Sequence, residues 1–233
     1  MSEAKGRISL LDGWRGFVLY LMVVYHLLFD LCVFGWMSWD VMNSWPMELT
    51  EAFGAYSFIL CAGISSNLSR SNLRRGLVTL AAGAVVTAVS FAAGMPIRFG
   101  ILQFLGLAML LWAAAGKTVL RVPDRAAPFL WIGLFAVFRI LTDRVLVSVR
   151  WLFWLGFRYP EYESYDHFPV LPYIFLFFLG GWMGSVIVKR RGSLPLLDRK
   201  APKLLTWPGQ RTLWIYLLHQ PVLYGICFLI SRI

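Results

Sequence analysis

Seven long apolar runs dominate this chain of 233 residues and leave only short polar segments between them. A helix needs about twenty apolar residues to cross roughly 30 Å of hydrocarbon, with its backbone groups paired internally. We therefore predict an all-α integral membrane protein, a bundle of about seven transmembrane helices in a single domain covering residues 1–233. The runs are Gly16–Gly35, Phe53–Leu68, Gly76–Gly94, Phe99–Gly116, Pro128–Val149, Phe168–Val188 and Leu213–Ile230.

Composition excludes a soluble domain of this size. Hydrophobic residues make up 59% of the chain, charged residues only 15%, and the mean hydropathy is +0.67. A soluble protein must cover its exterior with polar groups, whereas a bilayer removes that requirement. The net charge of +10 does not indicate nucleic acid, because the basic residues form short clusters between apolar runs. We predict a lipid bilayer and no nucleic acid as partner.

Orientation follows from the basic residues, which favour cytoplasmic segments. Sixteen of the 22 fall in alternate segments if the N-terminus is cytoplasmic and the C-terminus outside, which is the topology we predict. The longest of these segments is Lys189–Arg211. We predict that it is irregular, because it contains Pro195, Pro202 and Pro208. The sixteen are Lys5, Arg7, Arg15, Arg70, Arg74, Arg75, Lys117, Arg121, Arg125, Lys189, Arg190, Arg191, Arg199, Lys200, Lys203 and Arg211.

The first run contains two ionisable residues four positions apart, His26 and Asp30, which share one helix face. Charged groups inside a membrane are costly, so each is a candidate functional residue. A carboxylate beside an imidazole fixes its tautomer and raises its basicity, as a general base requires. The alternative is a packing hydrogen bond without chemistry.

A second polar group lies in the last run, where His219 and Gln220 precede Pro221. Pro221 lacks a backbone donor and leaves the carbonyl of Leu217 free, so a local kink could line a cavity. The alternative is a polar contact between helices.

Asp166 and His167 come just before the sixth run. We expect Asp166 to cap that helix, and His167 to lie at the interface with a structural role unless it binds substrate. Two prolines, Pro169 and Pro172, suit the start of a helix there.

Two arginines have acidic partners nearby in sequence. Arg139 and Asp143, four apart in the fifth run, are expected to neutralise each other inside the bundle, with substrate binding by Arg139 as the alternative. Arg15, three residues after Asp12, is either a local ion pair or an anion site for a phosphate-bearing ligand. No zinc-ligand spacing, nucleotide-binding loop or nucleophile elbow is present, so no metal is expected.

Four stretches in order resemble the bacterial branch of the heparan-α-glucosaminide N-acetyltransferase catalytic-domain family, among the transmembrane acyltransferases. They are Arg7–Gly16 with the following run to His26, then Arg98–Ala108, Asp166–Pro172 and Tyr216–Pro221. The resemblance covers nearly the whole chain. It implies a multi-pass protein of the bacterial inner membrane.

The implied reaction is acyl transfer from cytosolic acetyl-CoA, or another acyl-CoA, to a hydroxyl or amino group of a glycan or lipid-linked acceptor. A homo-oligomer is left open. We expect His26, oriented by Asp30, to deprotonate the acceptor or to carry the acyl group transiently, and His219 with Gln220 to polarise the thioester carbonyl. The residues expected to bind substrate or cofactor are Arg15, Gln103, Arg139, Asp166, His167 and Gln220.

Two other classes of protein fit the residues. A small-solute or proton-coupled transporter would use His26, Asp30, Arg139 and Asp143 as a relay, and it would have no reason to bind CoA. A non-catalytic membrane module would tolerate alanine at each of these sites.

Overall fold

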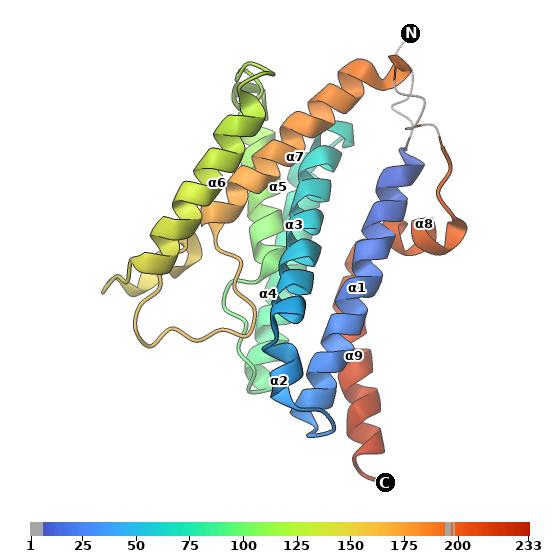
Figure 1. Cartoon of the computed structure of the whole chain (residues 1–233), viewed down its shortest axis with the longest axis vertical. Coiled ribbons are helices and arrows are strands. Elements are labelled where there is room, and N and C mark those ends of the chain that lie inside the picture. Colours follow the sequence, from blue (N-terminus) through green and yellow to red (C-terminus); the bar gives the residue numbers. More distant parts are fainter. Residues whose placement is uncertain (1–6, 194–196, 198) are drawn as a thin grey trace. The chain divides into compact units, whose positions relative to one another are not determined.

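The computed structural model describes residues 7–193, 197 and 199–233. Every regular element longer than an isolated β-bridge within these residues is a helix (Figure 1). Lys5 and Pro195 lie outside the described residues. The α-helices are α1 (Ser9–Val33), α2 (Trp39–Met42), α3 (Trp45–Leu68), α4 (Asn72–Ala92), α5 (Ile101–Val119), α6 (Ala127–Arg144), α7 (Val170–Arg190), α8 (Lys203–Gln210) and α9 (Thr212–Ile230), and the 3₁₀ helices are η1 (Arg150–Leu155) and η2 (Arg191–Ser193).

Five of these helices are long and apolar enough to cross a membrane: α1, α4, α5, α7 and α9. They confirm an all-α chain with several spans, and they coincide with five of the seven predicted runs. The other two runs coincide with α3 and α6, which are less apolar. In α6, the three charged residues Arg139, Asp143 and Arg144 fall near the helix end. The count of seven spans and the orientation of the termini stay predictions.

The described chain divides into two compact units, which we treat separately. Unit 1 comprises residues up to 58 together with 191–233, and unit 2 comprises residues 59–190. Helix α3 begins in the first unit and ends in the second. A single transmembrane domain over residues 1–233 stays a prediction.

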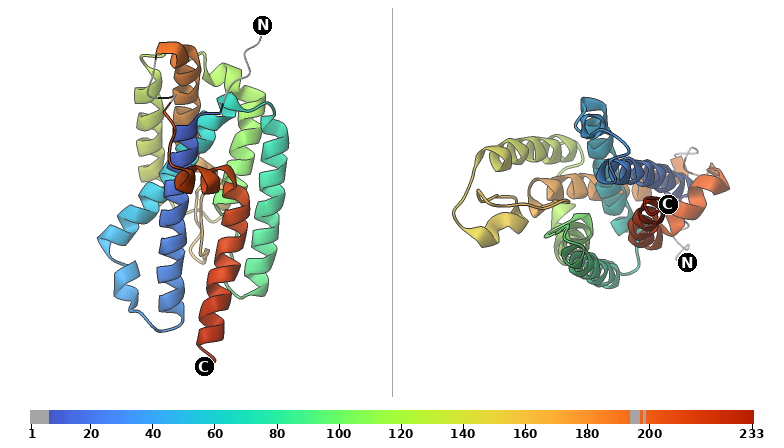
Figure 2. Two further views of the ribbon diagram at one scale, coloured as in Figure 1. Left: turned by 90° about the vertical axis from the view of Figure 1, so that its right-hand side faces the viewer. Right: turned by 90° about the horizontal axis from the view of Figure 1, so that it is seen from below.

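In unit 1, α1 packs against both α8 and α9, and Figure 2 shows α1 and α9 side by side. The contact between α1 and α8 is backbone against backbone. A Cβ atom on Gly16 would lie 1.8 Å from the carbonyl oxygen of Leu205, and one on Gly209 would lie 1.8 Å from that of Asp12. Small residues permit such close approach of helices in membranes.

The irregular inner segment predicted from its prolines is wrong in part, because α8 occupies Lys203–Gln210 within it. Pro202 stands just ahead of the helix, where a missing N–H costs nothing. Pro208 lies inside the helix, but it is buried, and α8 is held by its packing on α1. Tertiary contacts therefore override the local preference.

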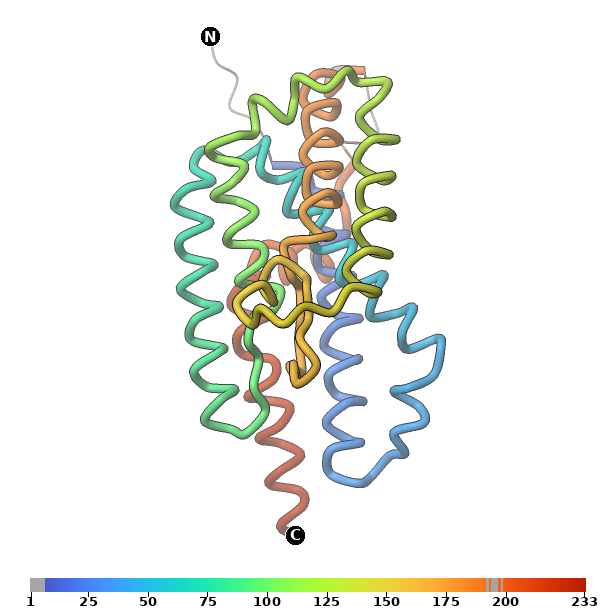
Figure 3. The backbone as a smooth tube through the Cα atoms, turned by 90° about the vertical axis from the view of Figure 1, so that its left-hand side faces the viewer, coloured from blue at the N-terminus to red at the C-terminus, as the bar shows by residue number. Residues whose placement is uncertain are grey.

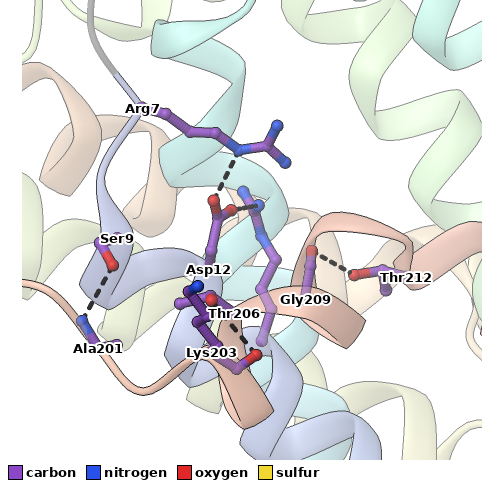
Figure 4. Close-up of polar contacts among 9 residues, drawn as sticks. Arg7, Ser9, Asp12, Ala201, Lys203, Thr206, Gly209 and Thr212 are labelled. Atoms are coloured by element: carbon purple, nitrogen blue, oxygen red, sulfur yellow. Dashed lines mark hydrogen bonds and ion pairs between the residues drawn. The ribbon is translucent and has the colours of Figure 1, made fainter.

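Figure 4 shows the polar contacts at the start of α1 and one contact with the segment just before α8. The carboxylate of Asp12, only 2% exposed, accepts hydrogen bonds from Arg7 Nε at 2.6 Å and Arg15 Nη1 at 2.9 Å. The hydroxyl oxygen of Ser9 accepts from the backbone N–H of Ala201 at 2.9 Å. Of these contacts, only the one between Ser9 and Ala201 connects α1 to the segment that leads into α8.

In unit 2, α4 lies beside α5 and α6 beside α7 (Figure 3). The side chain of Gln103 on α5 donates to the carbonyl of Gly83 at 2.8 Å and to the hydroxyl of Thr87 at 2.6 Å, both on α4. Phe104 and Phe177 are fully buried and belong to the apolar core of this unit.

Candidate active site

Four polar side chains meet between α1 and α9 in unit 1. His26 and Asp30 are one turn apart on α1, and His219 and Gln220 are adjacent on α9. The rings of His26 and His219 lie edge to face with centroids 4.8 Å apart. The amide nitrogen of Gln220 donates to Asp30 Oδ1 at 2.7 Å. The structure thus brings together the residues predicted to be catalytic, with Gln220 beside them.

The two imidazoles share one hydrogen-bonding arrangement. Nδ1 of His26 lies 2.8 Å from the carbonyl oxygen of Met22, and Nδ1 of His219 lies 2.6 Å from that of Tyr216. A carbonyl oxygen only accepts, so each Nδ1 carries a hydrogen. In a neutral imidazole, Nε2 then has the free lone pair, which is the form a general base needs.

These contacts correct the predicted pairing of His26 with Asp30. A carbonyl of its own helix orients His26, while the Asp30 carboxylate is engaged by Gln220. The carbonyl four residues earlier on a helix is within reach of a histidine ring, which spacing to Asp30 alone does not reveal.

Three atoms of this cluster are buried without a hydrogen-bond partner among the described residues. They are Asp30 Oδ2, His219 Nε2 and Gln220 Oε1. Asp30 is 0% exposed and His219 is 9% exposed. Leaving one such group unpaired costs about 1–3 kcal/mol. Buried polar atoms are usually paired, so three unpaired atoms on two facing helices make this cluster a candidate binding site.

A pocket of about 360 Å³ opens next to the cluster, between α1, α8 and α9. His219 is part of its wall, and apart from that ring the lining is mainly aliphatic and aromatic. Residues that line it include Leu19 and Val23 of α1, Trp207 and Pro208 of α8, and Leu223 of α9. Cavities of this size hold small-molecule ligands.

The α8 contribution to this pocket was missed from the sequence. An eight-residue stretch with Leu204, Leu205 and Trp207 among polar neighbours is a signal for a short surface helix. Pro202 just before the stretch and Pro208 within it obscured that signal.

In unit 2, Asp166 caps a different helix from the one predicted. Its Oδ2 accepts from the backbone N–H of Ile101 at 3.2 Å, at the start of α5, whereas α7 begins only at Val170. A carboxylate at a helix N-terminus is stabilised by the free N–H groups and the dipole. The capping chemistry was predicted correctly and the helix was not.

Gln103 has a clear structural task. Its amide nitrogen binds α4, and its Oε1 accepts from the backbone N–H of Gly100 at 3.1 Å. Both ends of the amide are therefore engaged inside unit 2. Its role in binding substrate stays a prediction.

His167 pairs with a tyrosine that the sequence did not single out. Its Nδ1 lies 2.7 Å from the hydroxyl of Tyr162, and its Nε2 is buried without a partner among the described residues. Burial, with help from nearby Arg158, lowers the pKa of His167 to about 4. Burial is also the main cause that raises the pKa of Tyr162 to about 12. Both groups are therefore neutral at pH 7.

The two arginines are held by ion pairs. Arg139 and Asp143 are 3.2 Å apart, as predicted, but their side chains are 42% and 43% exposed, so they are not enclosed in the bundle. A phenol oxygen, that of Tyr173, lies 3.4 Å from Arg139 Nη1. Arg15 is paired with Asp12 as described above, which supports the local ion pair over the anion site.

Helices able to cross a membrane, with a buried polar cluster on two of them, define an integral multi-pass membrane protein. The family model described as heparan-alpha-glucosaminide N-acetyltransferase, catalytic, matches residues 7–221. The chain belongs to this family, which implies acetyltransferase activity in general. No curated protein and no solved structure gives a match. The match ends just after the cluster residues of α9.

Proposed function

We propose that the protein is an acetyltransferase of the bacterial inner membrane that uses cytosolic acyl-CoA. It transfers the acyl group to a hydroxyl or amino group of a glycan or lipid-linked acceptor. Family membership supports acetyl transfer, and the α1/α9 cluster supports the place where it happens.

The observation that carries this proposal is the set of unpaired buried atoms. With Asp30 ionised and His219 neutral with its hydrogen on Nδ1, Asp30 Oδ2, His219 Nε2 and Gln220 Oε1 all accept hydrogen bonds. Their complement is a molecule that brings several donors, as a sugar hydroxyl or amino group does. An acyl acceptor of this kind would pair the atoms that the protein leaves open.

The reaction at this cluster is a direct displacement. Nε2 of His26 takes the proton of the acceptor hydroxyl or amine as that group attacks the thioester carbonyl carbon. The new C–O or C–N bond forms, the C–S bond breaks, and CoA leaves as the thiol after receiving the proton. The three unpaired atoms of Asp30, His219 and Gln220 hold the acceptor by accepting hydrogen bonds from its other donor groups.

The proposed mechanism does not assign polarisation of the thioester carbonyl to His219. Its Nδ1 hydrogen is already donated to Tyr216, and Nε2 of a neutral ring has no hydrogen to donate. We therefore assign His219 to hold the acceptor rather than to stabilise negative charge on the carbonyl oxygen.

The test is acetyl transfer by purified protein in lipid nanodiscs. Acetyl-CoA is supplied with a panel of amino sugars, neutral sugars and polyprenyl-linked sugars, and both the free CoA thiol and the acetylated acceptor are measured. Equal amounts of the two products, with one acceptor class preferred, are expected. Absence of both products and of CoA binding, with proton or solute flux in liposomes, would support the transporter instead.

A further inference from the structure

The pocket beside His219 is larger than an acetyl group requires. Its volume is about 360 Å³, whereas a water molecule in the liquid occupies about 30 Å³. A two-carbon acyl group would leave most of this space unfilled, and unfilled apolar space loses packing contacts. Aliphatic side chains such as Leu19, Val23 and Leu223 line the pocket and would contact a hydrocarbon chain favourably.

The α8 side of the pocket is cationic. Trp207 forms part of the wall, and the guanidinium of Arg211 stacks over its ring at 4.7 Å from the centroid. Lys203 stands on the same short helix and, like Arg211, is exposed. An anionic head at these residues and an apolar chain inside the pocket would match the charge and polarity of both regions.

We infer that the pocket binds the acyl chain of the donor, and that the protein accepts acyl groups of roughly four to eight carbons as well as acetyl. This inference rests on the proposed function. The phosphates of acyl-CoA lie near Arg211 and Lys203, the chain enters between Val23 and Leu223, and the thioester lies by His219.

Binding of a graded series of donors tests the inference without any reaction. Non-transferable ethyl, butyl, hexyl, octyl and dodecyl thioethers of CoA are titrated into the full-length protein in nanodiscs, with empty nanodiscs as blank. Each buried methylene should tighten binding about fourfold until the pocket is full. We expect the gain to stop near eight carbons.

Two variants of the pocket should change, in opposite directions, the chain length at which the gain in affinity stops. Val23→Phe fills the pocket, so it should abolish the gain in affinity from the butyl to the octyl thioether. Leu223→Ala enlarges the pocket and should shift the end of the gain to longer chains. The matched control is Val24→Phe, because Val24 is the next residue on α1, is 54% exposed and is absent from the pocket wall.

The outcomes separate this inference from the proposed function. If the protein transfers acetyl from acetyl-CoA but binds the ethyl to octyl thioethers with equal affinity, the inference of an acyl-chain pocket is overturned. The proposed acetyltransferase function would then still stand. An equal effect of Val23→Phe and Val24→Phe would also overturn the acyl-chain pocket, because the gain would then reflect partition into lipid. Failure of every CoA derivative to bind, with no acetyl transfer, would overturn both.

Discussion

Both units contain buried polar atoms without a partner among the described residues, but these atoms are grouped differently. In unit 2 they are Asn72 Oδ1 on α4, Trp131 Nε1 on α6 and His167 Nε2 ahead of α7, and so belong to separate elements. On α1 and α9, three acceptor atoms of Asp30, His219 and Gln220 have no partner among the described residues. Elsewhere in unit 2, the side chain of Gln103 donates hydrogen bonds to α4, and the carboxylate of Asp166 accepts one from the start of α5. The proposed function accordingly assigns substrate binding to the α1/α9 cluster and a scaffold role to Gln103 and Asp166.

The largest effect should come from the contact that positions the α1 side of the cluster. Gly16→Ala places a methyl group 1.8 Å from a backbone oxygen, which helix α8 can relieve only by moving away. We expect a loss of about 3 kcal/mol or more in unfolding free energy. Thermal unfolding in nanodiscs measures it.

Gly225→Ala is the matched control on α9, because nothing lies within 4 Å of the added methyl group. Alanine is the better helix former, so this variant should be neutral or stabilised by up to about 1 kcal/mol. Equal destabilisation by both alanines would contradict the close contact of α1 with α8.

Removing the scaffold glutamine should lower stability and leave the chemistry alone. Gln103→Leu breaks two bonds to α4 and the bond to Gly100. We expect a loss of about 2–3 kcal/mol in unfolding free energy. Turnover per folded molecule should stay within about twofold of wild type. A large drop in turnover at normal stability would move Gln103 to the group that binds substrate.

Asp30→Asn separates hydrogen-bond acceptance from charge at the cluster. The amide keeps one acceptor oxygen for Gln220 or for the substrate but loses the other. We expect KM for the acyl acceptor to rise by about tenfold, with little change in KM for acetyl-CoA. Steady-state kinetics with each substrate varied in turn distinguishes this from a uniform loss of activity.

A pH dependence of stability belongs to His167. Its pKa is about 4 in the folded protein and about 6.5 when unfolded, so the unfolded chain binds more protons between these values. The stability contributed by neutral His167 is complete above pH 6.5 and is lost as pH falls towards 4. Melting temperatures of wild type and His167→Gln should converge over that window. Parallel curves would contradict the burial of a neutral ring.

Much of this fold could be predicted because long apolar runs have one solution in a membrane, the helix. The positions of His26 and Asp30 on one span and of His219 and Gln220 on another were also evident from the sequence. The hydrogen-bond partners of these four residues could not be predicted. The ring hydrogens of His26 and His219 go to the backbone carbonyls of Met22 and Tyr216, and a sequence motif does not reveal such partners.

Long-range contacts were the other limit on prediction. Asp166 caps α5, which starts 65 residues earlier, and sequence proximity pointed instead to the helix that follows it. Helix α8 exists because glycines on α1 and α8 let the two backbones meet. Both contacts join residues that are far apart in the sequence, so a local pattern does not predict them.

The most direct test of the comparison is turnover per folded molecule in His26→Ala, measured beside Val24→Ala in the same nanodiscs. Val24 is an exposed neighbour on α1 that takes no part in the cluster, so its variant should match wild type. If His26 is the base, its loss should cut acetyl transfer at least 10²-fold while CoA binding changes little. Wild-type turnover in folded His26→Ala protein would contradict the assignment of the active site to the α1/α9 cluster.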